Sequence, residues 1–347
     1  MRLHAGSRIG IVQAFNIGDV VACLPLAGLI KRHYPGSRIV FVGRCYAEAV
    51  ALACVHIDEF LDAQACLHDP QVLARAKLDV LINPFPHREI AQAAYQARVP
   101  VRVGNLRRGA YARWCNRFVF YGRRGTGLHE AQLNLRDLRA MGIRDNVDLP
   151  GLAALMGLTR LAPLEAQHRA LLDPARFNLL LHPRSNGNSR EWPLAHYLAL
   201  IQQLPPRFKV FLTGTEADAQ TIEQNFPQLL RAPGVTPLFG RFTLPQFISF
   251  IAAADGMVAA STGPLHLAAA LGRHALGIYP SRAGLNAKRW GPVGPRAQVA
   301  QLAPACPYAG KSCKRVGDGL ACACTEAVTP ASVLATLAQW QALQRPS

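Results

Sequence analysis

The order of apolar and amphipathic segments constrains the fold of this chain more than any other feature. Apolar runs at 8–15, 38–44, 78–86 and 99–104 are typical of buried strands, and helical stretches separate them. Strands joined through helices form parallel sheets, because each helix returns the chain to the same end of the sheet. The first part of the chain is therefore predicted to be an α/β domain with helices on both faces.

The alternation weakens across residues 146–176 and then begins again. Prolines, glycines and a short helical segment fill this stretch, which we interpret as a connection between domains. Beyond it, apolar runs such as FNLLLHP, FKVFLTG and GMVAA alternate with helices once more. We predict one domain of residues 1–160, a second of residues 161–328, and a final helix in 329–347 that packs back across both. Ligands are expected in a cleft between the carboxyl ends of the two sheets.

Composition narrows the class of partner. The chain has 347 residues, which suits two hydrophobic cores, and 38 Lys and Arg against 21 Asp and Glu give a net charge of +17. Such a charge predicts anionic partners: nucleic acid, a membrane surface or phosphorylated substrates. No apolar run approaches the roughly 18 residues of a membrane span, and Val20–Ile30 lacks the flanks of a signal peptide. We expect a cytoplasmic protein that at most rests on a membrane.

The nine cysteines leave one question open. Five are scattered singly, as small apolar side chains of a reduced protein are. The other four, Cys306, Cys313, Cys322 and Cys324, cluster late but match no standard zinc spacing. Both a metal site and free loop thiols fit this cluster.

A polar helix start follows one apolar strand of the second domain. Ser261 and Thr262 precede a helix with Pro264 near its first position, and His266 lies within its first turn. The unpaired amides and the dipole of such a start favour a bound anion, to which His266 can donate a hydrogen bond. That His266 instead satisfies a neighbouring carbonyl fits its position equally well.

Two other polar segments leave strands of the second domain. The loop RSNGNSREWP carries hydroxyls, amides and two arginines, and its Arg190 offers bidentate contacts to a phosphate. Glu216 follows the next strand, where it holds sugar hydroxyls or caps its own helix. Neither a G-x-G-x-x-G nor a P-loop fingerprint occurs, so dinucleotide and P-loop sites lack support.

The first domain contains a basic–aromatic segment. No acidic residue lies between Glu89 and Glu130. Eight arginines occur there, and aromatic residues, among them the last four of this list, are interleaved with them: Arg98, Arg102, Arg107, Arg108, Arg113, Arg117, Arg123, Arg124, Tyr111, Trp114, Phe118 and Tyr121. The pattern suits an anionic glycolipid at a membrane, single-stranded nucleic acid, or simply a basic surface.

Several segments, in order, resemble glycosyltransferase family 9, the lipopolysaccharide heptosyltransferases. They are FNIGDVVACLPLAGLIKRHYP, HPRSNGNSREWPLAHY, LFGRFTLPQFISFIAAADGMVAASTGPLHLAAALG and the cysteine-bearing tail. The resemblance implies a GT-B architecture, in which two Rossmann-like domains with parallel sheets face a central cleft. It also implies inverting transfer of heptose, or a related sugar, from ADP-heptose or a similar nucleotide sugar to a lipopolysaccharide core, without a metal or other cofactor.

The resemblance also assigns residues. It places the catalytic carboxylate on Asp19, although an aspartate there also caps a helix well. The donor site is expected on Ser185, Asn186, Arg190, Glu216, Ser261, Thr262, Gly263 and His266. The acceptor site is expected on Arg88, Arg107, Arg108 and Arg113. Because Ser261 stands where the family has Asp, and Arg190 where it has Lys, the donor sugar stays open.

The prediction is thus a cytoplasmic glycosyltransferase, peripheral at the inner membrane. Its expected partners are a nucleotide sugar, an anionic lipopolysaccharide-type glycolipid and the membrane surface, and no nucleic acid. One alternative is a nucleotide-binding protein of the same fold without transfer activity. Another is a basic nucleic-acid-binding protein, for which no recognisable module is present.

Overall fold

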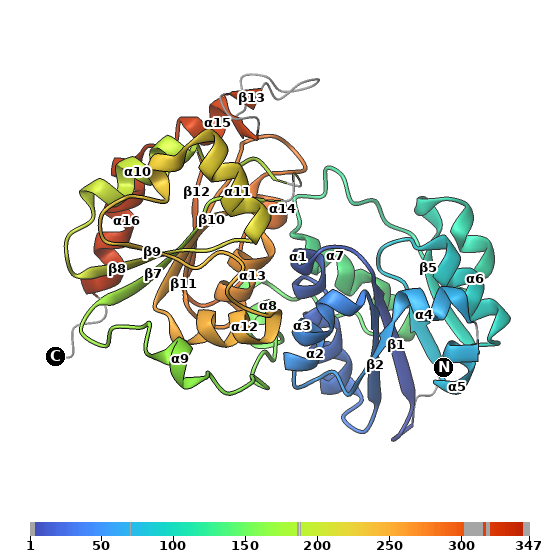
Figure 1. Ribbon diagram of the computed structural model, residues 1–347. Coiled ribbons are helices and arrows are strands. Elements are labelled where there is room, and N and C mark those ends of the chain that lie inside the picture. The colour runs from blue at the N-terminus through green and yellow to red at the C-terminus, as the bar shows by residue number, and fades with distance from the viewer. Residues whose placement is uncertain are drawn as a thin grey trace. The chain divides into compact units, whose positions relative to one another are not determined.

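The chain forms two compact units, Met1–Leu161 and Ala162–Ser347. A computed structural model describes residues 4–69, 71–185, 187, 189–301, 315–316 and 320–342. Each unit is built on a six-stranded sheet with helices around it (Figure 1). The boundary between the units falls inside the stretch that the sequence marks as a connection.

Unit 1 contains a parallel sheet with the strand order β3-β2-β1-β4-β5-β6. Its strands are β1 (Arg8–Gln13), β2 (Arg38–Gly43), β3 (Glu59–Asp62), β4 (Val80–Ile82), β5 (Val101–Asn105) and β6 (Arg117–Val119). In the register, Ile9 of β1 pairs with Ile39 of β2 on one side and with Val80 of β4 on the other. The strand order reverses between β1 and β4, and doubly wound sheets bind ligands at the carboxyl ends of strands at such a switch point.

The helices of unit 1 occur between and after its strands along the chain. They are α1 (Ile17–Val21), α2 (Leu24–His33), α3 (Glu48–Ala53), α4 (Ala63–His68), α5 (Gln71–Arg75), α6 (Arg88–Gln96), α7 (Glu130–Leu135) and α8 (Leu149–Ala154), with the 3₁₀ turns η1 (Cys45–Ala47), η2 (Leu106–Arg108), η3 (Ala110–Trp114) and η4 (Arg136–Met141). The segment after β1 forms two helices, because Pro25 in the first turn of α2 has no amide with which to continue α1.

Unit 2 repeats the topology with the strand order β12-β11-β10-β7-β8-β9. Its strands are β7 (Phe177–His182), β8 (Phe208–Leu212), β9 (Val235–Pro237), β10 (Gly256–Ala260), β11 (His274–Ile278) and β12 (Ala297–Ala300). The order reverses between β7 and β10, which makes their carboxyl ends the switch point of this sheet. A short antiparallel pair, β13 (Arg315–Val316) and β14 (Ala321–Cys322), lies outside the sheet.

The helices of unit 2 cover both faces of this sheet. They are α9 (Ala166–Arg169), α10 (Leu194–Gln203), α11 (Glu216–Asn225), α12 (Leu244–Ala253), α13 (Gly263–Ala270), α14 (Ala287–Trp290), α15 (Ala323–Glu326) and α16 (Pro330–Ala342), with the turn η5 (Pro227–Leu229). The last helix, α16, lies beside α10 (Figure 1), and its Trp340 is buried with its ring stacked on His274. These contacts anchor α16 within unit 2.

No helix among the described residues is both long enough and apolar enough to cross a membrane. The cores are made by the apolar runs read from the sequence: Ile9, Ile11 and Val12 of β1, for example, are buried on both faces of the sheet. This burial orients the strands, and it leaves the polar residues at their carboxyl ends to form the sites described next.

Candidate functional site

Asp19, the predicted catalytic residue, lies just past the carboxyl end of β1. It is the third residue of α1, and its Oδ2 accepts a hydrogen bond from the Asn16 amide at 3.2 Å. This bond is one half of a capping box, so Asp19 does help to cap its helix. A carboxylate has two oxygens, and capping by one leaves the second able to accept a proton.

The surroundings of Asp19 favour a stronger base than an ordinary aspartate. Burial raises the pKa of Asp19 to about 6, and the nearby charge of Glu130 raises it too, whereas the hydrogen bonds of Asn16 and the charge of Arg123 lower it. With this pKa the side chain is still ionised at neutral pH. A base whose pKa lies close to the working pH is the one that general-base catalysis needs.

A buried charged cluster lies behind α1. Arg123 and Glu130 form an ion pair, and their side chains are 2% and 4% exposed. Both terminal nitrogens of Arg123 donate to Asn134 Oδ1 at 3.0 Å, and Asn134 Nδ2 donates to the carbonyl of Ala22 at 3.1 Å. The cluster therefore ties α7 to the end of the helix that carries Asp19.

The sequence did not predict this cluster, and one of its residues, Arg123, was expected elsewhere. We expected Arg123 on the surface with the other arginines of the basic–aromatic segment, and that expectation is wrong, because Arg123 pairs with Glu130 in the interior. Tyr111 and Tyr121 are buried as well, and the Tyr121 hydroxyl donates to Asp137 at 3.0 Å. The sequence did contain one signal for this ion pair: Glu130, the acidic residue that ends the acid-free stretch, is a possible partner for a nearby arginine.

The predicted acceptor arginines belong to three different elements of unit 1. Arg88 begins α6 after β4, and Arg107 lies in η2 after β5, so both follow carboxyl ends of strands. Arg113 lies in η3, whose Trp114 carbonyl accepts a hydrogen bond from Arg102 near the start of β5 at 2.7 Å. Arg113 therefore belongs to a segment that contacts the start of β5, whereas Arg107 follows its end. The side chain of Arg108 lies outside the described part of the structure.

The predicted donor residues come together in unit 2. β7 pairs with β10 from Leu179 opposite Gly256 to His182 opposite Ala259, so the loops that follow these two strands begin side by side. Ser185 and Arg190 belong to the first loop. Ser261, Thr262, Gly263 and His266 form the second loop and the start of α13. Asn186 lies outside the described residues.

Five buried polar atoms in these two loops have no hydrogen-bond partner in the described structure. They are Arg184 Nε, Ser185 Oγ, Ser189 Oγ, Arg190 Nε and Thr262 Oγ1. A buried polar group without a partner costs about 1–3 kcal/mol, so such groups are rare in folded proteins. Their concentration at the switch point of unit 2 indicates a site for a polar ligand.

A buried carboxylate holds the first of these loops. Glu191 Oε2 accepts a hydrogen bond from Arg184 Nη1 at 2.8 Å, and its Oε1 accepts one from the Ser185 amide at 2.5 Å. The next residue, Trp192, is buried and donates from Nε1 to the carbonyl of Val328 at 2.7 Å. Sequence reasoning did not single out Arg184 or Glu191. Glu191 compensates the positive charge of Arg184. The other positive charge of the loop, that of Arg190, is therefore the one that can act on a ligand.

Glu216 follows β8, the strand next to β7. Its helix is capped by other residues: the Thr215 amide donates to Asp218 Oδ2 at 2.8 Å, and the Asp218 amide donates to Thr215 Oγ1 at 3.1 Å. Glu216 is exposed at the first position of α11, where a carboxylate still complements the helix dipole, so the capping alternative stays open. Its predicted contact with sugar hydroxyls stays a prediction.

The start of α13 differs from the expected cap. Thr262 occupies the N-cap position, but its hydroxyl makes no capping bond and is one of the five atoms named above. His266 is buried in the first turn, and its backbone amide donates to the Thr262 carbonyl at 3.3 Å. The Thr262 hydroxyl therefore stays available to a ligand at this helix start.

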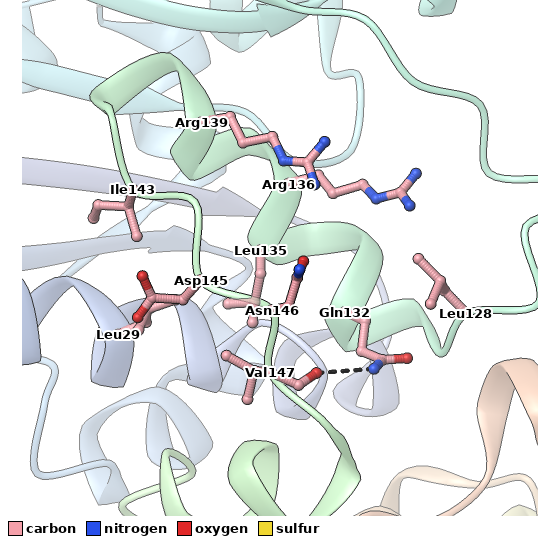
Figure 2. A pocket seen from close by; sticks show the side chains of 10 residues that line it. All are labelled: Leu29, Leu128, Gln132, Leu135, Arg136, Arg139, Ile143, Asp145, Asn146 and Val147. Atoms are coloured by element: carbon pink, nitrogen blue, oxygen red, sulfur yellow. Dashed lines mark hydrogen bonds between the residues drawn. The ribbon is translucent and has the colours of Figure 1, made fainter.

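One pocket of unit 1 contains none of the predicted site residues. Figure 2 shows its lining, in which Arg136 and Arg139 extend to the same side of η4 and Gln132 donates to the Val147 carbonyl at 2.8 Å. Its volume is about 210 Å³. Because neither Asp19 nor an acceptor arginine lines it, we do not assign the reaction to this pocket.

The late cysteines give no metal site in the described part of the chain. No three side chains of His, Cys, Asp or Glu come together among those residues. Cys322 and Cys324 are buried at the start of α15, whereas Cys306 and Cys313 lie outside the described residues. The question that the sequence left open about this cluster is therefore not tested.

Comparison with known proteins assigns the family. Residues 144–315, which include the loop after β7 and the start of α13, match glycosyltransferase family 9 (heptosyltransferase). The protein is a glycosyltransferase with a family 9 region. This confirms the family read from the sequence motifs. A protein of Haemophilus influenzae that is provisionally named a glycosyltransferase is 22% identical over 317 residues, which are 88% of this chain and 90% of that protein.

Solved structures share the fold of this glycosyltransferase. The Escherichia coli ADP-heptose lps heptosyltransferase II superposes with a TM-score of 0.74 at 18% identity, covering 97% of this chain and 99% of its own. A family 9 glycosyltransferase of Veillonella parvula gives 0.75 at 15% identity over 99% of both chains. The E. coli heptosyltransferase WaaC with ADP gives 0.70 at 17% identity over 96% and 99%. The predicted GT-B fold class, two Rossmann-like units with parallel sheets, is confirmed.

Proposed function

We propose that this enzyme transfers heptose, or a related sugar, from ADP-heptose or a similar nucleotide sugar to a lipopolysaccharide core acceptor, with inversion and without a metal. The observation that carries the donor half is the group of five buried, unpartnered polar atoms at the carboxyl ends of β7 and β10. Two of these atoms belong to arginines and one belongs to Thr262 at the start of α13, a combination that suits a diphosphate. A structural neighbour is described with ADP, and another is titled an ADP-heptose transferase.

Asp19 is the proposed base. It takes the proton of the acceptor hydroxyl while that oxygen attacks the anomeric carbon, and the bond from this carbon to the diphosphate oxygen breaks with its electron pair on the leaving nucleotide. Arg190 and the amides at the start of α13 stabilise the negative charge that develops on the diphosphate. One base and one displacement invert the anomeric centre.

The proposed acceptor is an anionic glycolipid at the cytoplasmic face of the inner membrane. Arg88 and Arg107 follow the carboxyl ends of β4 and β5 in the unit that carries Asp19, and both are exposed. Arginine suits phosphate and carboxylate groups of a lipopolysaccharide core because its planar fork binds them bidentately. Arg108 and Arg113 belong to the same proposed set, although Arg113 lies in η3, which contacts the start of β5.

Calorimetry with free nucleotides tests the donor class. We expect ADP to bind at least about tenfold more tightly than UDP, GDP or CDP, which corresponds to about 1.4 kcal/mol. Incubation with ADP-heptose and a lipopolysaccharide core fragment is then expected to release ADP in amounts equal to the heptosylated product. ADP binding without product would support the alternative of a nucleotide-binding protein that transfers nothing.

A further inference from the structure

One edge of the unit 1 sheet exposes several large apolar side chains. Of the eight large apolar side chains exposed among the described residues, four lie on or near this edge: Phe118 (44% exposed) on β6, Phe120 (73%) just after it, Leu106 (50%) in η2 and Tyr95 (51%) in α6. Single exposed apolar residues are common, but a group of them marks a surface that meets a partner. We call these four residues and the exposed arginines among them the β6 edge.

The sheet register aligns these side chains. β6 is the outermost strand, and its Phe118 pairs with Gly104 of β5 while Val119 pairs with Asn105. Successive side chains of a strand point to opposite faces, so Phe118 and Phe120 share a face while Val119 is buried. The register ends at Asn105, and Leu106 follows at the start of η2, next to Arg107, whose guanidinium lies over the Phe120 ring.

Arginines accompany the apolar side chains along the whole edge. The Arg107 guanidinium lies 5.6 Å from the ring centre of Phe120, and the Arg113 guanidinium lies 5.2 Å from that of Trp114. Trp114 in turn lies 5.2 Å from Tyr95, between ring centres. Arg107, Arg113 and Arg117 are exposed and take part in no ion pair of the described structure. The β6 edge is therefore both apolar and positively charged.

We infer that the β6 edge docks on an anionic membrane surface. Phenylalanine and leucine side chains bury apolar area at the boundary between headgroups and acyl chains, and arginines bind lipid phosphates, each contributing about 1 kcal/mol near an anionic bilayer. Single-stranded nucleic acid would use stacking aromatic rings, whereas Leu106 is aliphatic and suits lipid. The inference rests on the proposed function and deepens it. An acceptor that is anchored in a bilayer must be reached at the bilayer surface, so the enzyme needs a surface that binds there.

Flotation of the full-length protein with vesicles tests the inference. We expect binding to vesicles that contain phosphatidylglycerol, weak binding to pure phosphatidylcholine, and loss of binding at high salt. Phe118→Ser/Phe120→Ser and Arg117→Glu are each expected to weaken vesicle binding about tenfold or more. The matched controls Val55→Ser/Leu149→Ser and Arg241→Glu change exposed residues elsewhere and are expected to bind like the wild type.

Three results would overturn the inference. They are equal binding to both kinds of vesicle, unchanged vesicle binding by the β6-edge variants, and loss of single-stranded RNA binding by these variants with vesicle binding retained. Circular dichroism of each variant shows whether it is folded. ADP calorimetry on the same samples separates the two proposals: flotation without nucleotide binding would contradict the proposed function alone, and nucleotide binding without flotation would contradict the β6 edge alone.

Discussion

Asp19 serves both as a partial helix cap and as the proposed base, and one substitution separates the two roles. Asp19→Asn keeps an oxygen that accepts from the Asn16 amide but removes the basicity. We expect the variant to fold, to bind ADP like the wild type, and to lose at least about a hundredfold in turnover, as the loss of a positioned base implies. If Asp19→Asn transfers sugar at nearly the wild-type rate, another residue is the base. If the variant does not fold, the role of Asp19 is to cap its helix.

The pKa of Asp19 also makes a prediction about stability. The pKa of Asp19 is about 6 in the folded protein and about 3.8 in an unfolded chain, so the folded state binds the proton more tightly. Protonation of Asp19 therefore contributes to the free energy of unfolding. This contribution is present below about pH 4 and is lost as pH rises through 6, so ionised Asp19 costs at most about 2–3 kcal/mol at pH 8. Asp19→Asn, which cannot ionise, is therefore expected to have the higher melting temperature at pH 8, and this advantage is expected to vanish near pH 4. A lower melting temperature of the variant at pH 8 would show that the hydrogen bond outweighs the burial.

At the level of elements, the buried cluster joins α7 to α1. A change in this cluster is therefore expected to alter the pH dependence of kcat/KM. Glu130→Gln removes the negative charge that helps to raise the pKa of Asp19 while it keeps an oxygen for Arg123. The acid limb of kcat/KM is expected to move to lower pH, accompanied by a loss of stability, because Arg123 keeps a buried charge. The control Glu59→Gln makes the same change in a partly exposed ion pair with Arg8 and is expected to leave the pH profile in place. An unshifted profile in Glu130→Gln would limit the cluster to a structural role.

The start of α13 is the second element whose function a single variant tests. If its amides, Thr262 and His266 hold the donor diphosphate, His266→Ala is expected to weaken ADP binding about ten- to a hundredfold, the loss of one strong hydrogen bond. Calorimetry measures this, and the melting temperature without nucleotide is the control for folding. Unchanged ADP affinity would mean that His266 only satisfies a neighbouring group of the protein.

For the whole molecule, the sequence predicts the strands and the sheet topology, which depend on local pattern. It does not predict side-chain pairings between residues that are distant in the sequence or brought together by a loop. The apolar runs that became β1 and β7 are buried on both faces, so their strands and the parallel topology follow from the order of segments. The pairing of Arg123 with Glu130 could not be predicted, because nothing local distinguishes Arg123 from the exposed Arg124 beside it. Likewise, Glu191 holds Ser185 and Arg184 only through the fold of the loop, a contact that no spacing rule describes.

The charge of the whole chain leads to the last prediction. A departing nucleotide diphosphate needs positive charge, which many sugar transferases obtain from a divalent cation held by paired aspartates. This chain has a net charge of +17 and no Asp-x-Asp sequence, and it places Arg184 and Arg190 at the switch point of unit 2. We therefore expect transfer to continue in EDTA at constant ionic strength, and Arg190→Ala to reduce turnover about a hundredfold or more, since the charge on the leaving group then lacks its cation. Arg207→Ala removes an exposed arginine of the same unit and is expected to have no effect. Restoration of EDTA-treated enzyme by Mg²⁺ or Mn²⁺, beyond what an equal ionic strength of NaCl achieves, would show that a metal ion and not Arg190 stabilises the leaving diphosphate.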